Sequence, residues 1–128
     1  MKRLAALCVV LVSSLAACAL PTGDRDVYTA GSPELAHASV SAEGVWESVP
    51  WHGQNAPWLE VGPRVTAELE HTLGREPRAV LVYLAFDPEG TDPALAAGDL
   101  ARVVEVTENT VAVKNDTNAT YFIRVVAF

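Results

Sequence analysis

The chain has 128 residues and a formal net charge of −7, and half of its residues are hydrophobic. An acidic chain repels phosphates, which argues against nucleic acid as a partner. It holds only two cysteines, so an apolar core and not a disulfide framework must stabilise any folded domain.

The first 17 residues have the organisation of an export signal. Lys2 and Arg3 precede an apolar run, residues 4–15, that carries no charge. A membrane-spanning helix needs about 20 apolar residues, so this shorter run predicts a signal peptide, residues 1–17, that is removed. Cleavage would leave a chain of the size of one domain, with seven basic and sixteen acidic side chains.

The residues at the expected cleavage site are Leu15-Ala16-Ala17-Cys18. This stretch resembles the lipobox of bacterial lipoproteins, in which a leucine and two small residues precede an obligatory cysteine. The resemblance implies cleavage before Cys18, a diacylglyceryl group on the Cys18 sulfur and an acylated amino terminus, which together give stable membrane anchoring. Cys18 would be the only cysteine left, since Cys8 lies in the signal. The alternative is an ordinary signal peptide, with Cys18 as a free thiol.

The residue after the cysteine bears on location. In many Gram-negative lipoproteins an aspartate at this position signals retention in the inner membrane, whereas this chain has Ala19. The resemblance therefore implies a lipid-anchored protein of the bacterial cell envelope, in the outer membrane if the organism is Gram-negative. The membrane would be a partner through the N-terminal lipid.

Residues 18–44 are expected to comprise the lipidated cysteine and a flexible tether. They include few large apolar side chains and many small, polar and turn-forming ones, which bury too little surface to offset the entropy of ordering. A single folded domain is expected over residues 45–128.

Two segments in the first half of this domain show strand patterns. Apolar and polar residues alternate over 65–71, which favours a strand, with a helix as the alternative because Glu, Ala and Leu are good helix formers. The apolar octet 79–86 lies between prolines and predicts a strand buried on both faces at the centre of a sheet. Residues 87–98 then predict a loop, with room for one helical turn at 93–97.

The last thirty residues predict a three-stranded meander, with strands at 100–107, 110–114 and 119–128. Short strands about ten residues apart predict an all-β fold, a small antiparallel β-sandwich or barrel. The runs "HTLGREPRAVLVYLAF" and "YFIRVVAF" also resemble small β-sandwich modules of phage tail-fibre tips and H-type lectins. This resemblance covers residues 60–128 and transfers no sugar-contact residue.

The three tryptophans within residues 46–58 are the main candidates for ligand binding. Trp51, His52 and Trp58 combine flat rings with hydrogen-bonding groups, as sugar- and peptide-binding sites do. The alternative is that these tryptophans pack in the core, with Trp46 the most deeply buried.

Other side chains do not predict chemistry. The histidines at positions 37, 52 and 71 are too far apart for a local metal motif. The loop carboxylates Asp87, Glu89 and Asp92 are only a fragment of a calcium site, so a solvated acidic turn is favoured. No serine has the setting of a nucleophile. We therefore expect no catalytic residue, no metal and no cofactor.

The sequence thus predicts a lipid-anchored cell-envelope protein of structural or interaction type, non-enzymatic, with a glycan or an envelope protein as partner. The first alternative is a carbohydrate- or peptide-binding module that uses the Trp46–Trp58 segment. A small envelope hydrolase is the more distant third.

Overall fold

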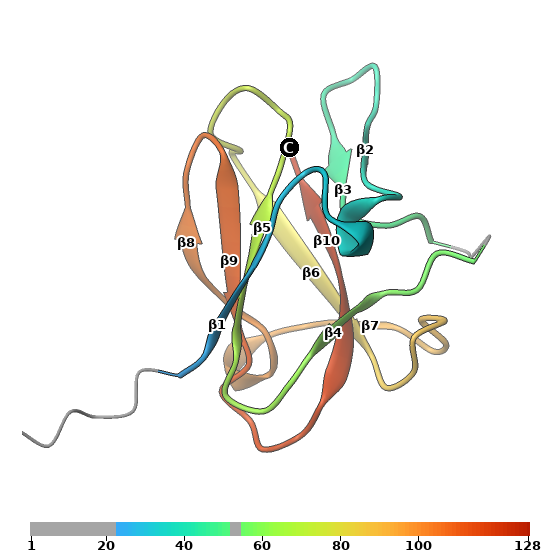
Figure 1. Cartoon of the computed structure of the whole chain (residues 1–128), viewed down its shortest axis with the longest axis vertical. Helices are drawn as coiled ribbons and strands as arrows, with labels where there is room; N and C mark the ends of the chain where they lie inside the picture. Colours follow the sequence, from blue (N-terminus) through green and yellow to red (C-terminus); the bar gives the residue numbers. More distant parts are fainter. Residues whose placement is uncertain (1–22, 52–54) are drawn as a thin grey trace, which may run out of the picture.

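Two β-sheets packed face to face make up the part of the chain that the computed structural model describes, residues 23–51 and 55–128 (Figure 1). One sheet has the strand order β1-β5-β9-β8, and the other has the order β2-β3-β10-β6-β7 with β4 also paired to β10. The strands are β1 (Arg25–Tyr28), β2 (Ser39–Val40), β3 (Trp46–Glu47), β4 (Leu59–Val61), β5 (Thr66–Glu70), β6 (Val80–Ala85), β7 (Ala94–Leu95), β8 (Arg102–Val106), β9 (Thr110–Lys114) and β10 (Tyr121–Ala127). Two short 3₁₀ helices, η1 (Pro33–Leu35) and η2 (Gly98–Leu100), accompany them. The predicted small all-β sandwich is confirmed.

Strand β5 confirms the alternation expected for residues 65–71. Ala67 and Leu69 are buried in the core between the sheets, whereas Glu68 and Glu70 lie on the opposite face of the strand and are only partly buried. The helix alternative is wrong, because residues 66–70 pair with β9 in an antiparallel ladder.

The centre of the second sheet is β10 and not β6, which corrects the expectation for residues 79–86. Strand β10 pairs with β6 along one edge and with β3 and β4 along the other. On the outer side of β6 lies only the two-residue strand β7, in place of the helical turn expected at 93–97. Tyr83 on β6 is consequently only partly buried, and Phe86 just beyond the strand is exposed.

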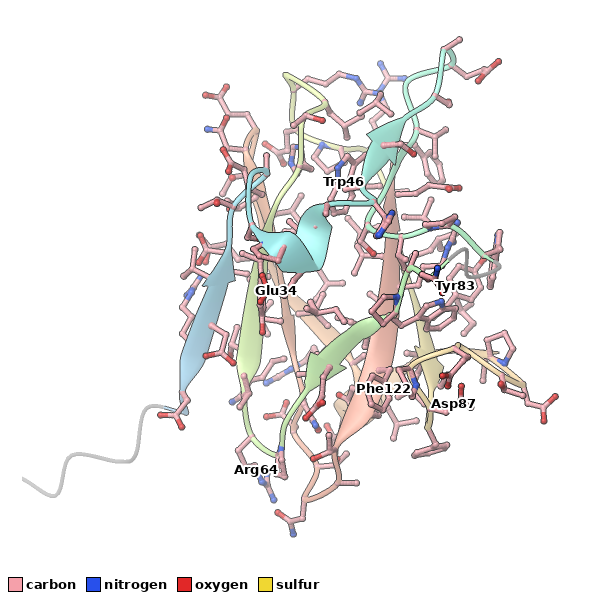
Figure 2. The ribbon with its side chains drawn as sticks, turned by 45° about the vertical axis from the view of Figure 1, so that its right-hand side comes forward. Glu34, Trp46, Arg64, Tyr83, Asp87 and Phe122 are labelled. Atoms are coloured by element: carbon pink, nitrogen blue, oxygen red, sulfur yellow. The ribbon has the colours of Figure 1, made fainter. Side chains whose placement is uncertain are left out.

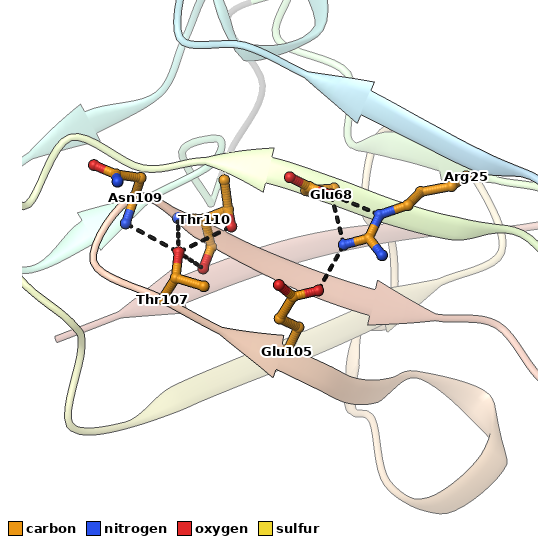
Figure 3. Close-up of polar contacts among 6 residues, drawn as sticks. All are labelled: Arg25, Glu68, Glu105, Thr107, Asn109 and Thr110. Atoms are coloured by element: carbon orange, nitrogen blue, oxygen red, sulfur yellow. Dashed lines mark hydrogen bonds and ion pairs between the residues drawn. The ribbon is translucent and has the colours of Figure 1, made fainter.

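The expected meander holds only for its first hairpin. Strands β8 and β9 pair as predicted, and the hydroxyl oxygen of Thr107 accepts hydrogen bonds from the backbone N–H groups of Asn109 and Thr110 in the turn (Figure 3). Strand β10 then belongs to the other sheet. A fully buried Asn115 stabilises this crossing, because its amide donates to the carbonyl oxygens of Gly62 and Ala119.

Residues 25–40, expected within a tether, are part of the sandwich. Strand β1 pairs in parallel with β5, β2 pairs with β3, and Leu35 is buried in the main core. The expectation was wrong because this segment needs no core of its own. It adds a few side chains to an existing core and gains backbone hydrogen bonds at a sheet edge.

Arg25 at the start of β1 ties this strand to the sheet surface. Its Nε donates to Glu68 on β5 at 2.6 Å, and its Nη2 donates to Glu105 on β8 at 2.7 Å (Figure 3). Ala112 on β9 is the register partner of both glutamates, so the arginine side chain bridges the sheet across a residue that has almost no side chain. The folded domain therefore begins at or before Arg25 and not at residue 45.

Candidate functional site

The tryptophan segment is divided between two apolar clusters of the sandwich. Trp46 is 1% exposed in the main core, and Trp58 is 3% exposed in a second apolar cluster with Val49, Ala56 and Ala85. Both rings therefore support the core-packing alternative. The structure brings Trp51 and Trp58 together, with ring centroids 6.1 Å apart, and His52 lies outside the described residues.

Trp51 covers a buried cation. Arg124 on β10 is fully buried; its Nε donates to the carbonyl oxygen of Val49 at 2.9 Å, and its Nη2 lies 2.9 Å from Oε1 of Glu47. The guanidinium carbon lies 4.1 Å from the centroid of the Trp51 ring, and the ring of Tyr83 meets that indole edge-on. The interaction between the cation and the aromatic face stabilises Arg124 where water is excluded. Trp51 thus has a structural role although part of its ring is exposed.

A groove of about 550 Å³ runs beside this cluster, between η1, the start of β4 and the loop after β6. Figure 2 shows two of its lining residues, Glu34 on η1 and Phe122 on β10. The lining consists of Pro33, Glu34, His37, Asn55, Pro57, Trp58, Leu59, Glu60, Pro88 and Phe122. Its volume lies in the range of small-ligand sites, roughly 300–1,000 Å³.

The groove is apolar along its floor and acidic at its rim. Trp58, Leu59 and Phe122 supply the apolar surface. Burial raises the pKa of the neighbouring Tyr28 phenol, and the negative charges of Asp26, Glu34 and Glu60 raise that pKa further. The carboxylates of Glu34 and Glu60, which line the groove, therefore create a negative potential in one region. Such a region suits a ligand with a positive charge beside an apolar group.

The loop after β6 holds the wall of the groove in place. Pro88 accepts a hydrogen bond from the backbone N–H of Trp58 at 2.8 Å. Gly90 has a φ of +71° and packs directly against the indole of Trp58, so that a side chain at position 90 would collide with the ring. The acidic residue Asp87 of this loop accepts a hydrogen bond from the backbone of Thr91, which lowers its pKa.

The other singled-out side chains have separate positions. His71 is buried beside Trp46, where its Nε2 donates to the carbonyl oxygen of Thr107 at 3.1 Å, whereas His37 lines the groove. Across residues 23–51 and 55–128, no three His, Cys, Asp or Glu side chains are arranged to hold a metal ion. No helix in those ranges is long and apolar enough to cross a membrane.

Of the predicted ligand residues that the structure describes, Trp51 and Trp58, only Trp58 lines this groove. The prediction does not include Glu34 and His37, because both lie in the expected tether, nor Phe122, which has the pattern of one more strand residue. The one local signal was Pro33 followed by an acidic residue, a pattern typical of the first turn of a helix.

Comparisons with protein-family models, with curated proteins and with solved structures find no match to this chain.

Proposed function

We propose that this chain is a lipid-anchored cell-envelope protein of interaction type, without enzymatic activity, whose folded part binds a partner in the groove. The observation that carries the anchor is Leu15-Ala16-Ala17-Cys18 at the end of a charged-then-apolar leader, with Cys18 as the only cysteine after cleavage. Ala19 favours the outer membrane if the organism is Gram-negative. The apolar surface that Trp58, Leu59 and Phe122 give the groove supports the binding of a partner.

The anchor is tested by metabolic labelling with a palmitate analogue in a bacterial host. The wild-type chain should incorporate the label and fractionate with membranes, whereas Cys18→Ser should lose both properties. A conservative Cys8→Ser variant is the matched control, since it also removes a thiol but lies inside the leader. Equal fractionation of wild type and Cys18→Ser would refute the proposal.

For the groove, the acidic rim favours a basic peptide segment over a neutral glycan, although both belong to the second candidate function. The test is an array that carries basic peptides and glycans side by side, probed with the mature chain. We expect binding to peptides that place Lys or Arg next to an apolar residue, and loss of that binding in Glu34→Gln and Glu60→Gln. Binding to glycans that ignores both substitutions would overturn the peptide assignment in favour of a carbohydrate module.

A further inference from the structure

We propose that one end of the sandwich, formed by Arg64, Arg102 and Lys114, binds the phosphate groups of anionic membrane lipids. These three residues are called the basic end below. The inference rests on the proposed lipid anchor, and it adds a second, non-covalent contact that would orient the domain on the bilayer.

The strand register brings two of the cations together. Lys114 at the end of β9 is the partner of Arg102 at the start of β8. Both pair with one carboxylate, since Asp116 lies 2.8 Å from Arg102 and 3.0 Å from Lys114. The hydrogen bond from Lys114 and the charges of Arg102, Lys114 and Arg64 lower the pKa of Asp116. One carboxylate is therefore shared among three positive side chains.

Arg64 completes the arrangement from the turn between β4 and β5. It has a φ of +62°, which non-glycine residues adopt rarely and at a cost in conformational energy. Its backbone N–H donates to Thr117, and its Nε donates to Asn118 at 3.2 Å. Within the described part of the chain, the two terminal nitrogens of Arg64 have no hydrogen-bond partner, so they are available to an external anion. Figure 2 shows this side chain at the tip of the sandwich.

A hollow lies among these groups. It measures about 420 Å³ and is lined by Gly23, Arg64, Lys114 and Asp116. Gly23 packs against the carbonyl group of Arg64 so closely that a side chain at position 23 would collide with it. Two exposed carboxylates, Asp24 and Asp99, lie at the same end, where their backbone carbonyls bond to Thr66 and Asp116. Recognition of a phosphate group therefore depends on the side-chain nitrogens of Arg64 and Lys114, which line the hollow, and not on a large net positive charge.

Chain length brings the hollow close to the expected anchor. Gly23 is five residues after Cys18, and a chain extends by at most about 3.6 Å per residue, so the two lie within about 18 Å. A lipid on Cys18 would hold the basic end within reach of the headgroups, whose negative potential attracts Lys and Arg. The acidic groove rim would be repelled by the same surface and left for a partner.

The experiment uses the mature, lipidated chain in vesicles of phosphatidylcholine, with and without phosphatidylglycerol. A fluorophore is attached at Thr120→Cys near the basic end or at Glu108→Cys in the turn at the other end of β9, and energy transfer to a headgroup-labelled lipid is measured. We expect transfer from position 120, but not from position 108, to rise with phosphatidylglycerol. This rise should be lost in Arg64→Gln and in Lys114→Gln, and kept in Arg78→Gln, which removes an equal charge at the opposite end.

The outcomes separate this inference from the proposed function. A chain that floats with the vesicles but shows the same transfer in Arg64→Gln, Lys114→Gln and Arg78→Gln would overturn the headgroup site and leave the anchor intact. A chain that does not float, and whose Cys18 thiol accepts the fluorophore, would overturn the anchor and this inference with it.

Discussion

The guanidinium carbon of Arg124 lies 4.1 Å from the centroid of the Trp51 ring, so a partly exposed indole covers a fully buried cation. This relationship changes the meaning of the tryptophan cluster. Trp51 resembles a sugar-binding platform in the sequence, yet its inner face is occupied by a side chain of the same protein. The ligand surface that we propose is instead the neighbouring groove.

Replacing Trp51 by Ala should therefore destabilise the domain even though 38% of that residue is exposed. We expect a loss of about 2–3 kcal/mol, because the substitution removes apolar contacts and uncovers Arg124. Urea unfolding measures the change, with Trp51→Phe as a control that keeps an aromatic face. An unchanged midpoint for Trp51→Ala would show that the ring is a free surface residue.

Gly90→Ala should lower the free energy of unfolding by about 2–4 kcal/mol, because it strains a positive φ and forces a methyl group into the Trp58 indole. Gly74→Ala is a matched control: its φ is +70°, and among the described residues no atom outside Gly74 and its two chain neighbours lies within 4 Å of the added methyl group. The control should show only the backbone cost, about 1 kcal/mol. Equal losses in the two variants would mean that the contact with Trp58 has no energetic weight.

Arg25→Gln should loosen β1 without unfolding the sandwich. The substitution removes the ion pairs with Glu68 and Glu105, both partly exposed and hence weakened by salt. Hydrogen exchange of the β1 amides should become faster in the variant, and high salt should bring the wild type toward the same rate. Arg78→Gln, which also removes one exposed arginine, should leave the β1 amides unchanged. If β1 exchanges at the wild-type rate in Arg25→Gln, backbone pairing with β5 suffices to hold it.

Asp116 should make stability depend on pH in the acid range. The pKa of Asp116 is lowered in the folded state, so folding favours the charged form and the stabilisation is present above the unfolded pKa of about 3.9. It should be lost as the pH falls through the lower, folded value. Melting temperatures of wild type and Asp116→Asn should differ at pH 6 and converge toward pH 2. Glu108→Gln, an equal charge change in an exposed turn, should differ less from wild type at every pH. A difference in melting temperature between wild type and Asp116→Asn that stays constant from pH 6 to pH 2 would contradict the link between Asp116 ionisation and stability.

Much of the fold could be predicted because strand periodicity is local. Residues 65–71 alternate between apolar and polar side chains, and residues 110–114 form a short apolar run bounded by turn residues; β5 and β9 form at these positions. The partner of each strand is not a local property. The expected β9–β10 hairpin does not form, because the buried amide of Asn115 holds the chain where it crosses to the other sheet.

The candidate site was less predictable than the fold. Glu34 and Glu60 are distant in the sequence, and both line the groove only because η1 packs beside β4. Arg64, Arg102 and Lys114 likewise come from three different segments, and only strand register places them at one end. Neither cluster has a sequence motif, because each depends on contacts between elements that are far apart in the sequence.

By itself, the amino-acid sequence determined the all-β class, the apolar strands and the expectation of a lipid at Cys18, because each depends on patterns within a few consecutive residues. The tertiary structure decided that residues 25–40 join the sandwich, that β10 is the centre of its sheet and that Trp51 covers Arg124. These features depend on which surfaces meet. A short polar segment becomes ordered when a sheet edge and a core already exist, and a tryptophan becomes structural when a buried cation lies beneath it.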